Sequence, residues 1–161
     1  TSIAAARKIF NISEANIKNS MKKMRLKGRL EEIKSGKLKN LIGENRLVID
    51  GGHNINSAIS ISNWVKQQNE KVHLICGMMN DKPHKEFVNQ FENSVNSITL
   101  IDIPNQEGSI SKEEFKKKLG NKNIHTAESI EESLLMNNKD KNCIFLCAGS
   151  LYLAGEVLNL N

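Results

Sequence analysis

Residues 50–54 carry the side chains of this chain that are best suited to chemistry. They have the sequence DGGHN and directly follow the apolar, β-branched run at 47–49. A carboxylate, an imidazole and an amide therefore lie close together at the end of a predicted buried strand. The glycines between them allow the backbone to approach a ligand closely. In open α/β sheets ligands bind at the carboxyl ends of strands, so this segment is the first candidate for a functional site.

Polar residues also follow other predicted strands. The sequence GMMNDK at 77–82 follows one of them, Asp102 ends another, and AGS at 148–150 ends the last. The carboxyl ends of parallel strands gather along one edge of a sheet. We therefore expect side chains that are far apart in the sequence to meet at this edge.

Each candidate residue also has a simpler structural interpretation. Asp50 could only cap a turn through its side chain, and His53 could be an ordinary surface histidine. Ser150 could be only the N-cap of the last helix, and residues 81–82 could form a solvated ion pair of little energetic weight. The chain contains neither a GxGxxG fingerprint nor a GxxxxGK[ST] phosphate loop. Residue types and spacing alone predict a phosphate- or carboxylate-binding domain and nothing more specific.

The elements that must position these residues alternate regularly along the chain. Strands are predicted at 46–50, 72–76, 97–102 and 143–147, with a short strand starting at Ile124. Helices are predicted at 54–68, 84–91, 111–119, 129–137 and 150–160. Continuous apolar strands alternating with helices indicate a mostly parallel sheet with helices on both faces. The predicted fold class is α/β and Rossmann-like, preceded by a short helical segment.

Two details of this pattern are further predictions. In the helix at 54–68, helical spacing predicts that these residues face the core: Ile55, Ala58, Ile59, Ile61, Ser62 and Val65. Upstream, residues 29–33 alternate like a strand. Residues 38–42 are predicted to pair with them as a second strand, across a turn at 35–36.

The first residues form a separate helical segment. Residues 2–10 have a helical pattern, and Ser13 is predicted to cap a second helix that runs to about Met24. Two lone helices bury little surface, so we expect this segment to pack on a part of the protein outside this chain. The chain begins with Thr1 and not with Met, and we expect it to be the C-terminal part of a longer protein.

Composition narrows the classes of function. A chain of 161 residues is one domain with at most a small appendage. The net charge is +5, but aromatic residues are scarce, so no nucleic-acid partner is predicted. The chain has no apolar run that could cross a membrane and no signal peptide, so no membrane partner is predicted. Three cysteines without a CxxC pair are typical of free core thiols in the reducing cytosol, which predicts a cytoplasmic location.

Four motifs follow one another along the chain: GRL at 28–30, DGGHN at 50–54, GMMNDK at 77–82 and GSLYLAGEV at 149–157. Together they resemble the C-terminal domain of the folylpolyglutamate synthase/dihydrofolate synthase family, in the Mur-ligase superfamily. The last two motifs are typical of the folate branch. The resemblance implies that residues 27–161 form the glutamate ligase domain. It also implies that residues 1–26 are the closing helices of the central ATPase domain.

The resemblance implies an ATP-dependent ligase that adds L-glutamate to dihydropteroate or folate through an acyl phosphate. It implies that Arg29 and Asp50 contact ATP, and that Asp50, His53 and Ser150 are catalytic. His53, Asn54 and Ser150 would surround the incoming glutamate. The family uses Mg²⁺, whose ligands are expected in the central domain, so we expect no metal ligand in this chain. We also expect a monomeric full-length enzyme, and no ligase activity from this chain alone.

The residues themselves agree with this resemblance on physical grounds. His53 and Ser150 each precede the start of a predicted helix. The N-terminus of a helix carries partial positive charge and unpaired N–H groups, which suit glutamate carboxylates or a transferring phosphate.

The chain departs from the family pattern in three places. Ile55 replaces a proline, residues 26–27 replace the Trp-Pro that commonly precedes the motif containing Arg29, and Pro83 replaces a second acid. Two other hypotheses stay open. The chain could be the C-terminal domain of a peptidoglycan Mur-type ligase, with the same fold and a different acceptor, or a non-catalytic Rossmann-like binding module.

Overall fold

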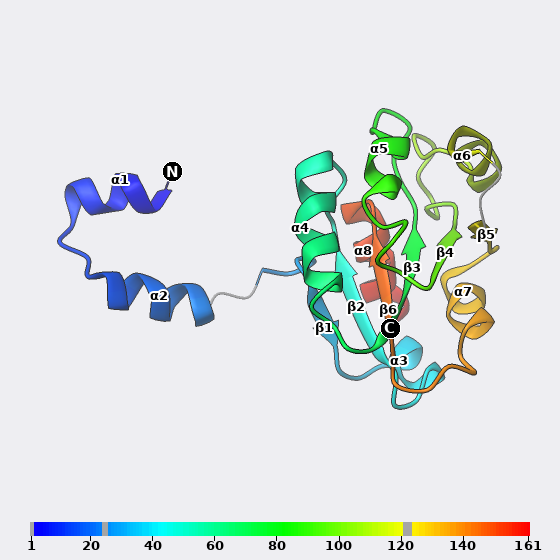
Figure 1. The fold of residues 1–161 in the computed structure, drawn as a ribbon, viewed down its shortest axis with the longest axis horizontal. Helices are drawn as coiled ribbons and strands as arrows, with labels where there is room; N and C mark the ends of the chain where they lie inside the picture. The colour runs from blue at the N-terminus through cyan, green and yellow to red at the C-terminus, as the bar shows by residue number, and fades with distance from the viewer. Residues whose placement is uncertain (1, 24–25, 121–123) are drawn as a thin grey trace.

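The computed structural model describes residues 2–23, 26–120 and 124–161 (Figure 1). Within these ranges the strands are β1 (Glu31–Ile33), β2 (Arg46–Asp50), β3 (Lys71–Cys76), β4 (Ser97–Leu100), β5 (Ile124–Thr126) and β6 (Cys143–Ala148). They form one sheet in the order β1-β2-β6-β3-β4-β5. Only the pairing of β1 with β2 is antiparallel, and the other four pairings are parallel. The predicted mostly parallel α/β sheet is confirmed.

Helices cover both faces of this sheet, as predicted (Figure 1). They are α3 (Lys37–Leu41), α4 (Ile55–Val65), α5 (His84–Asn89), α6 (Lys112–Leu119), α7 (Ile130–Met136) and α8 (Leu151–Leu160). Helices α4, α5 and α6 pack on one face, where Ala58, Phe87 and Phe115 belong to a single buried cluster. Helices α3, α7 and α8 supply Leu38, Leu134 and Val157 to the cluster on the other face.

The order of the strands creates a switch point at the carboxyl edge of the sheet. Strand β6 lies between β2 and β3, and Ala148 is in register with both Asp50 and Cys76. After β2 the chain turns into α4 on one face, and after β6 it turns into α8 on the other face. Loops that diverge in this way leave a crevice between them, which is where open α/β sheets bind their ligands.

The prediction of a strand at 38–42 is wrong, because this segment forms α3. Leu38 and Ile42, one helical turn apart, are both buried against the sheet. The Lys37 N–H donates to the carbonyl oxygen of Asn161 at 2.8 Å, which fixes the start of the helix against the C-terminus. Strand β1 instead pairs with β2. A short apolar run fits a helix or a strand equally well until its partner is known.

The prediction for α4 is partly wrong. Four of its predicted inward residues are buried, namely Ala58, Ile61, Ser62 and Val65. Ile55 and Ile59, however, are 41% and 43% exposed. They lie on the flank of the helix, beyond the stripe that contacts the sheet.

Helices α1 (Ser2–Ile9) and α2 (Glu14–Lys23) lie apart from the sheet in Figure 1. Ile9 and Phe10 are 75% and 62% exposed. This agrees with the expectation that the segment buries little surface within the chain; its packing on another part of the protein stays a prediction. Thr1 and Met24 lie outside the described residues. No helix in the described part of the chain has the length and apolar character that a membrane span requires.

Candidate functional site

Asp50, at the carboxyl end of β2, organises the hydrogen bonds of the site. Its side chain is buried, and Oδ1 accepts the Gly52 N–H at 2.6 Å while Oδ2 accepts the Leu30 N–H at 2.9 Å. The guanidinium of Arg29 lies 3.7 Å from Oδ1. Asp50 therefore caps its own turn, and it also binds the turn at 28–31. The same carboxylate also faces Arg29, for which the family resemblance implies a contact with ATP.

The turn at 28–31 presents Arg29 to the surface. Gly28 and Leu30 have φ values of 64° and 42°, in the left-handed region. For Leu30 this conformation costs roughly 1–2 kcal/mol, which the surrounding contacts must offset. The Gly51 N–H donates to the Gly28 carbonyl oxygen at 2.7 Å, and Glu31 Oε2 accepts the Gly28 N–H, also at 2.7 Å. The backbone of the turn is thus held in place while the Arg29 side chain stays 46% exposed.

A cavity of about 600 Å³ lies beside this turn. Its lining combines the cationic residues Lys27, Arg29 and Lys34, the acidic residues Glu31 and Glu32, and the apolar residues Leu26 and Leu30. Glu31 accepts the Gly28 N–H, and Glu32 pairs with Lys34. The Arg29 guanidinium at this cavity is of the kind that pairs with the phosphates of a nucleotide.

His53 has a defined tautomer when its ring is neutral. Its Nδ1 lies 3.0 Å from the Gly51 carbonyl oxygen, which can only accept, so Nδ1 carries the hydrogen. The Nε2 atom then keeps its lone pair and can accept a proton. The ring is half-buried and immediately precedes the first turn of α4.

The loop that follows β3 carries the acidic residue Asp81 and its neighbour Lys82. Asp81 has a lowered pKa, chiefly because Lys82 Nζ lies 2.7 Å from its Oδ2, with a smaller contribution from the charge of His53. Asp81 is 72% exposed, so the interpretation of residues 81–82 as a solvated ion pair is confirmed.

Asn54 is the N-cap of α4. Its Oδ1 accepts the Ser57 N–H at 2.9 Å, and Ser57 Oγ accepts the Asn54 N–H at 3.0 Å, which completes a capping box. This capping accounts for the position of the side chain. A contact between Asn54 and glutamate stays a prediction.

Ser150 is the N-cap of α8, as the simpler interpretation predicted. Its side chain is buried, and Oγ accepts the Tyr152 N–H at 3.1 Å. The preceding Gly149 has a φ of 113°, and a Cβ there would lie 2.7 Å from the Gly77 carbonyl oxygen. Its N–H donates to the Gly52 carbonyl oxygen at 3.1 Å. The loops after β2, β3 and β6 are therefore in direct contact through their glycines.

Asp102 does not join this group, although it follows β4 at the same edge of the sheet. Strands β6 and β3 separate β4 from β2. Asp102 Oδ1 accepts the Lys112 N–H at 2.7 Å, and Lys112 Nζ lies 2.8 Å from Glu128 and 3.2 Å from Asp102 Oδ2. Glu128 first and then Asp102 raise the pKa of Lys112, so this cluster is a set of satisfied ion pairs.

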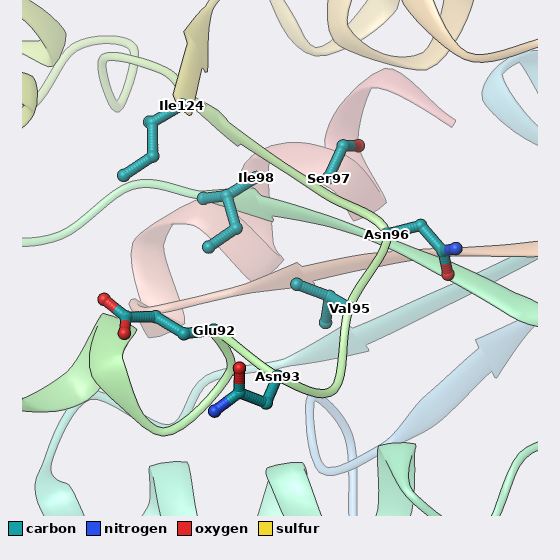
Figure 2. Close-up of a pocket in the computed structure, with 7 residues that line it drawn as sticks. All are labelled: Glu92, Asn93, Val95, Asn96, Ser97, Ile98 and Ile124. Carbon is teal, nitrogen blue, oxygen red and sulfur yellow. The ribbon is translucent and has the colours of Figure 1, made fainter. Parts of the chain in front are cut away.

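A second polar group lies at the opposite edge of the sheet. His73 Nδ1 is 2.8 Å from Ser97 Oγ, and His73 Nε2 is 3.1 Å from Asp140 Oδ2. This order of hydroxyl, imidazole and carboxylate is that of a nucleophile, its general base and the carboxylate that orients the base. However, Figure 2 shows the Ser97 hydroxyl pointing away from the adjacent cavity of about 330 Å³, into which Ile98 points. The group is therefore best explained as a structural link between strand starts.

The described residues contain no set of three His, Cys, Asp or Glu side chains that could hold a metal ion. The cysteines are free and buried, as predicted. Burial raises the pKa of the Cys147 thiol to about 12, which makes it a poor nucleophile or ligand.

Sequence analysis missed Glu31, the Gly28 carbonyl group and the Leu30 N–H as parts of the site. The signal for them was Gly28, directly before the predicted strand at 29–33, which indicates a turn without specifying its partner.

Comparison with known proteins agrees with this geometry. The family described as "Mur ligase, glutamate ligase domain" matches residues 28–151. No curated protein matches the chain. Among solved structures, Escherichia coli FolC in complex with ADP is similar over 98% of this chain and 37% of its own, with a TM-score of 0.74 and 20% identity. The chain thus spans about a third of the length of the structures it matches.

Two further structures show the same fold. Mycobacterium tuberculosis folylpolyglutamate synthase with ADP and AMPPCP covers 92% of this chain and 35% of its own, with a TM-score of 0.73 and 16% identity. A bifunctional folylpolyglutamate synthase/dihydrofolate synthase with Mn, AMPPNP and L-glutamate bound covers 92% and 34%, with a TM-score of 0.71 and 16% identity.

Proposed function

The chain belongs to the Mur ligase family through its glutamate ligase domain, and on that basis we propose that it is the C-terminal part of an ATP-dependent ligase. The reaction we propose joins L-glutamate to dihydropteroate or a folate. In this proposal residues 27–161 are the glutamate ligase domain and residues 1–26 close the central ATPase domain. The observation that carries it is the Arg29 turn, held on the buried Asp50 carboxylate beside the start of α4.

Arg29 is the residue we propose for the ATP phosphates. A guanidinium stays charged at every relevant pH and matches two phosphate oxygens at once. Asp50 faces it from 3.7 Å and fixes the backbone on both sides through Leu30 and Gly52. We assign Asp50 the role of orienting this part of the ATP site.

His53, Asn54 and Ser150 are the residues we propose around glutamate and the acyl phosphate. The first turns of α4 and α8 lie at the ends of neighbouring strands, and their N–H groups favour negative charge. In the proposed step the glutamate nitrogen attacks the acyl carbon, the carbon–oxygen bond to phosphate breaks, and phosphate leaves. The nitrogen then loses a proton, for which His53 Nε2 is the acceptor in reach of the same crevice.

Magnesium is expected from the resemblance, and a structural relative is described with Mn bound. The described residues of this chain offer no ligand set for it, so the ion would be held by another part of the protein. We propose that the protein is a cytoplasmic monomer without a nucleic-acid or membrane partner. Three free, buried thiols are consistent with a reducing compartment.

The test is an assay of the complete protein, including the sequence upstream of Thr1. We expect ADP release that requires both L-glutamate and a dihydropteroate or folate acceptor, with none from the 161-residue chain alone. ADP release only with a nucleotide-linked muramyl acceptor would favour the peptidoglycan alternative. If neither acceptor supports ADP release in the presence of glutamate and Mg²⁺, the result would favour the non-catalytic binding module.

A further inference from the structure

We propose that Glu31 is a positioning residue that acts on ATP through Arg29, an inference that rests on the function proposed above. The Glu31 carboxylate accepts the N–H of Gly28 at 2.7 Å, across the turn that carries Arg29. An ionised acceptor makes this bond stronger than a neutral one would. Glu31 thereby adds a hydrogen bond within the turn, in addition to the bonds that Asp50 and Gly51 make with it.

The turn requires such support because its backbone is unfavourable by itself. Gly28 and Leu30, the neighbours of Arg29 on either side, both have positive φ values. Two hydrogen bonds with the end of β2 and the residue after it act on the turn, since Gly51 donates to Gly28 and Leu30 donates to Asp50. The Gly28 N–H is left for Glu31. If this bond is lost, Gly28 keeps only the bond from the Gly51 N–H to its carbonyl oxygen. We then expect the turn to be more mobile and Arg29 to sample other positions.

Glu32, the neighbouring acid on β1, makes different contacts. The comparison distinguishes an effect of the position of the Glu31 carboxylate from a general effect of negative charge. Successive side chains of a strand point to opposite faces. Glu32 accordingly pairs with Arg46 at 3.3 Å and with Lys34, and not with the turn. The contribution of Glu31 therefore depends on where its carboxylate lies and not on negative charge near the strand.

The first experiment measures kcat/KM for ATP in the complete protein. We expect Glu31→Ala to lower it about tenfold while KM for glutamate stays unchanged, and Glu31→Gln, which keeps an acceptor oxygen, to recover most of the loss. Glu70→Ala, which removes an equal charge bound to Arg46 at 2.9 Å, is the matched control and should leave kcat/KM unchanged.

The double variant decides whether Glu31 acts through Arg29. If it does, adding Glu31→Ala to Arg29→Ala lowers kcat/KM no further than Arg29→Ala alone. If the two losses multiply, Glu31 acts by another route and the proposal is overturned.

The second experiment does not depend on the proposed reaction. Amide hydrogen exchange of the peptide that contains Gly28 is measured in the complete protein without nucleotide. We expect faster exchange in Glu31→Ala than in the wild type, partial restoration in Glu31→Gln, and no change in Glu70→Ala. Unchanged protection in Glu31→Ala overturns the proposal even if the ligase reaction is confirmed. If the ligase reaction fails instead, the exchange result still tests the link between Glu31 and the turn.

Discussion

The N–H of Gly149 donates to the carbonyl oxygen of Gly52 at 3.1 Å, which joins the loop after β6 to the loop after β2. These two loops lead to helices on opposite faces of the sheet. The crevice between them is therefore fixed by backbone atoms. The link between the two loops does not depend on the polar side chains of the crevice, whose roles can be measured by substitution.

Asp50→Asn tests the role of the buried carboxylate. We expect kcat/KM for ATP to fall at least tenfold, because Asn keeps one acceptor oxygen but loses the charge that faces Arg29. The free energy of unfolding should fall by about 1–3 kcal/mol, since one of the two N–H donors loses an ionised acceptor. Steady-state kinetics and chemical denaturation measure the two effects separately. Asp102→Asn is the control; wild-type kinetics in Asp50→Asn would show that the site is assigned wrongly.

His53→Ala tests the proposed proton acceptor. We expect turnover at least tenfold lower with an unchanged unfolding midpoint, because the ring is half-buried and its Nδ1 bonds only a carbonyl oxygen of its own turn. His125→Ala removes an exposed histidine on β5 and should leave turnover unchanged. Equal turnover in the two variants would remove His53 from the mechanism.

Gly149→Ala tests the close contact between the loops. A Cβ at this position would lie 2.7 Å from the Gly77 carbonyl oxygen and 2.9 Å from Cys76 Sγ. Gly43→Ala is the matched control, because Gly43 also has a positive φ but no atom lies within 4 Å of its Cβ position. We expect the control to cost roughly 1–2 kcal/mol of unfolding free energy, and Gly149→Ala to cost about 1–3 kcal/mol more. Thermal unfolding of both variants measures the difference, and equal costs would mean that the contact is not tight.

The buried His73 predicts that the domain is destabilised by mild acid. Burial lowers its pKa below the ordinary value of 6.5, although Asp140 opposes this shift. As the pH falls through 6.5, the unfolded state binds protons that the folded state does not, so the free energy of unfolding decreases. Above that pH the contribution of His73 is complete.

Urea unfolding between about pH 7.5 and pH 5.5 measures this effect. We expect His73→Gln to be less stable at neutral pH, because it loses the bond to Asp140. Its free energy of unfolding should also change less with pH than that of the wild type. Some dependence should remain, since burial also lowers the pKa of His84. If the free energy of unfolding changes with pH equally in His73→Gln and in the wild type, His73 is not the titrating group.

Local sequence was sufficient to predict most elements of the sheet domain, and the reason is periodicity. The predicted strand at 143–147 corresponds to β6 (Cys143–Ala148), and the predicted helix at 111–119 corresponds to α6 (Lys112–Leu119). A buried strand is apolar throughout and a surface helix is apolar on one side, so each pattern is visible without its partner. The segment that became α3 was mispredicted because it is too short for its period to be distinctive.

The sequence by itself determined which residues lie at the strand ends, since Asp50, His53 and Ser150 stand directly after an apolar run or within four residues of its end. Only the tertiary structure decided which of them meet. Strand order places β6 beside β2 and keeps β4 apart, so Ser150 lies near Asp50 while Asp102 does not. It also decided that Glu31, Gly28 and Leu30 hold Arg29 in position, because bonds from the turn to Asp50 and Gly51 join segments about twenty residues apart. Such bonds depend on the topology of the chain, which cannot be read from a local pattern of residues.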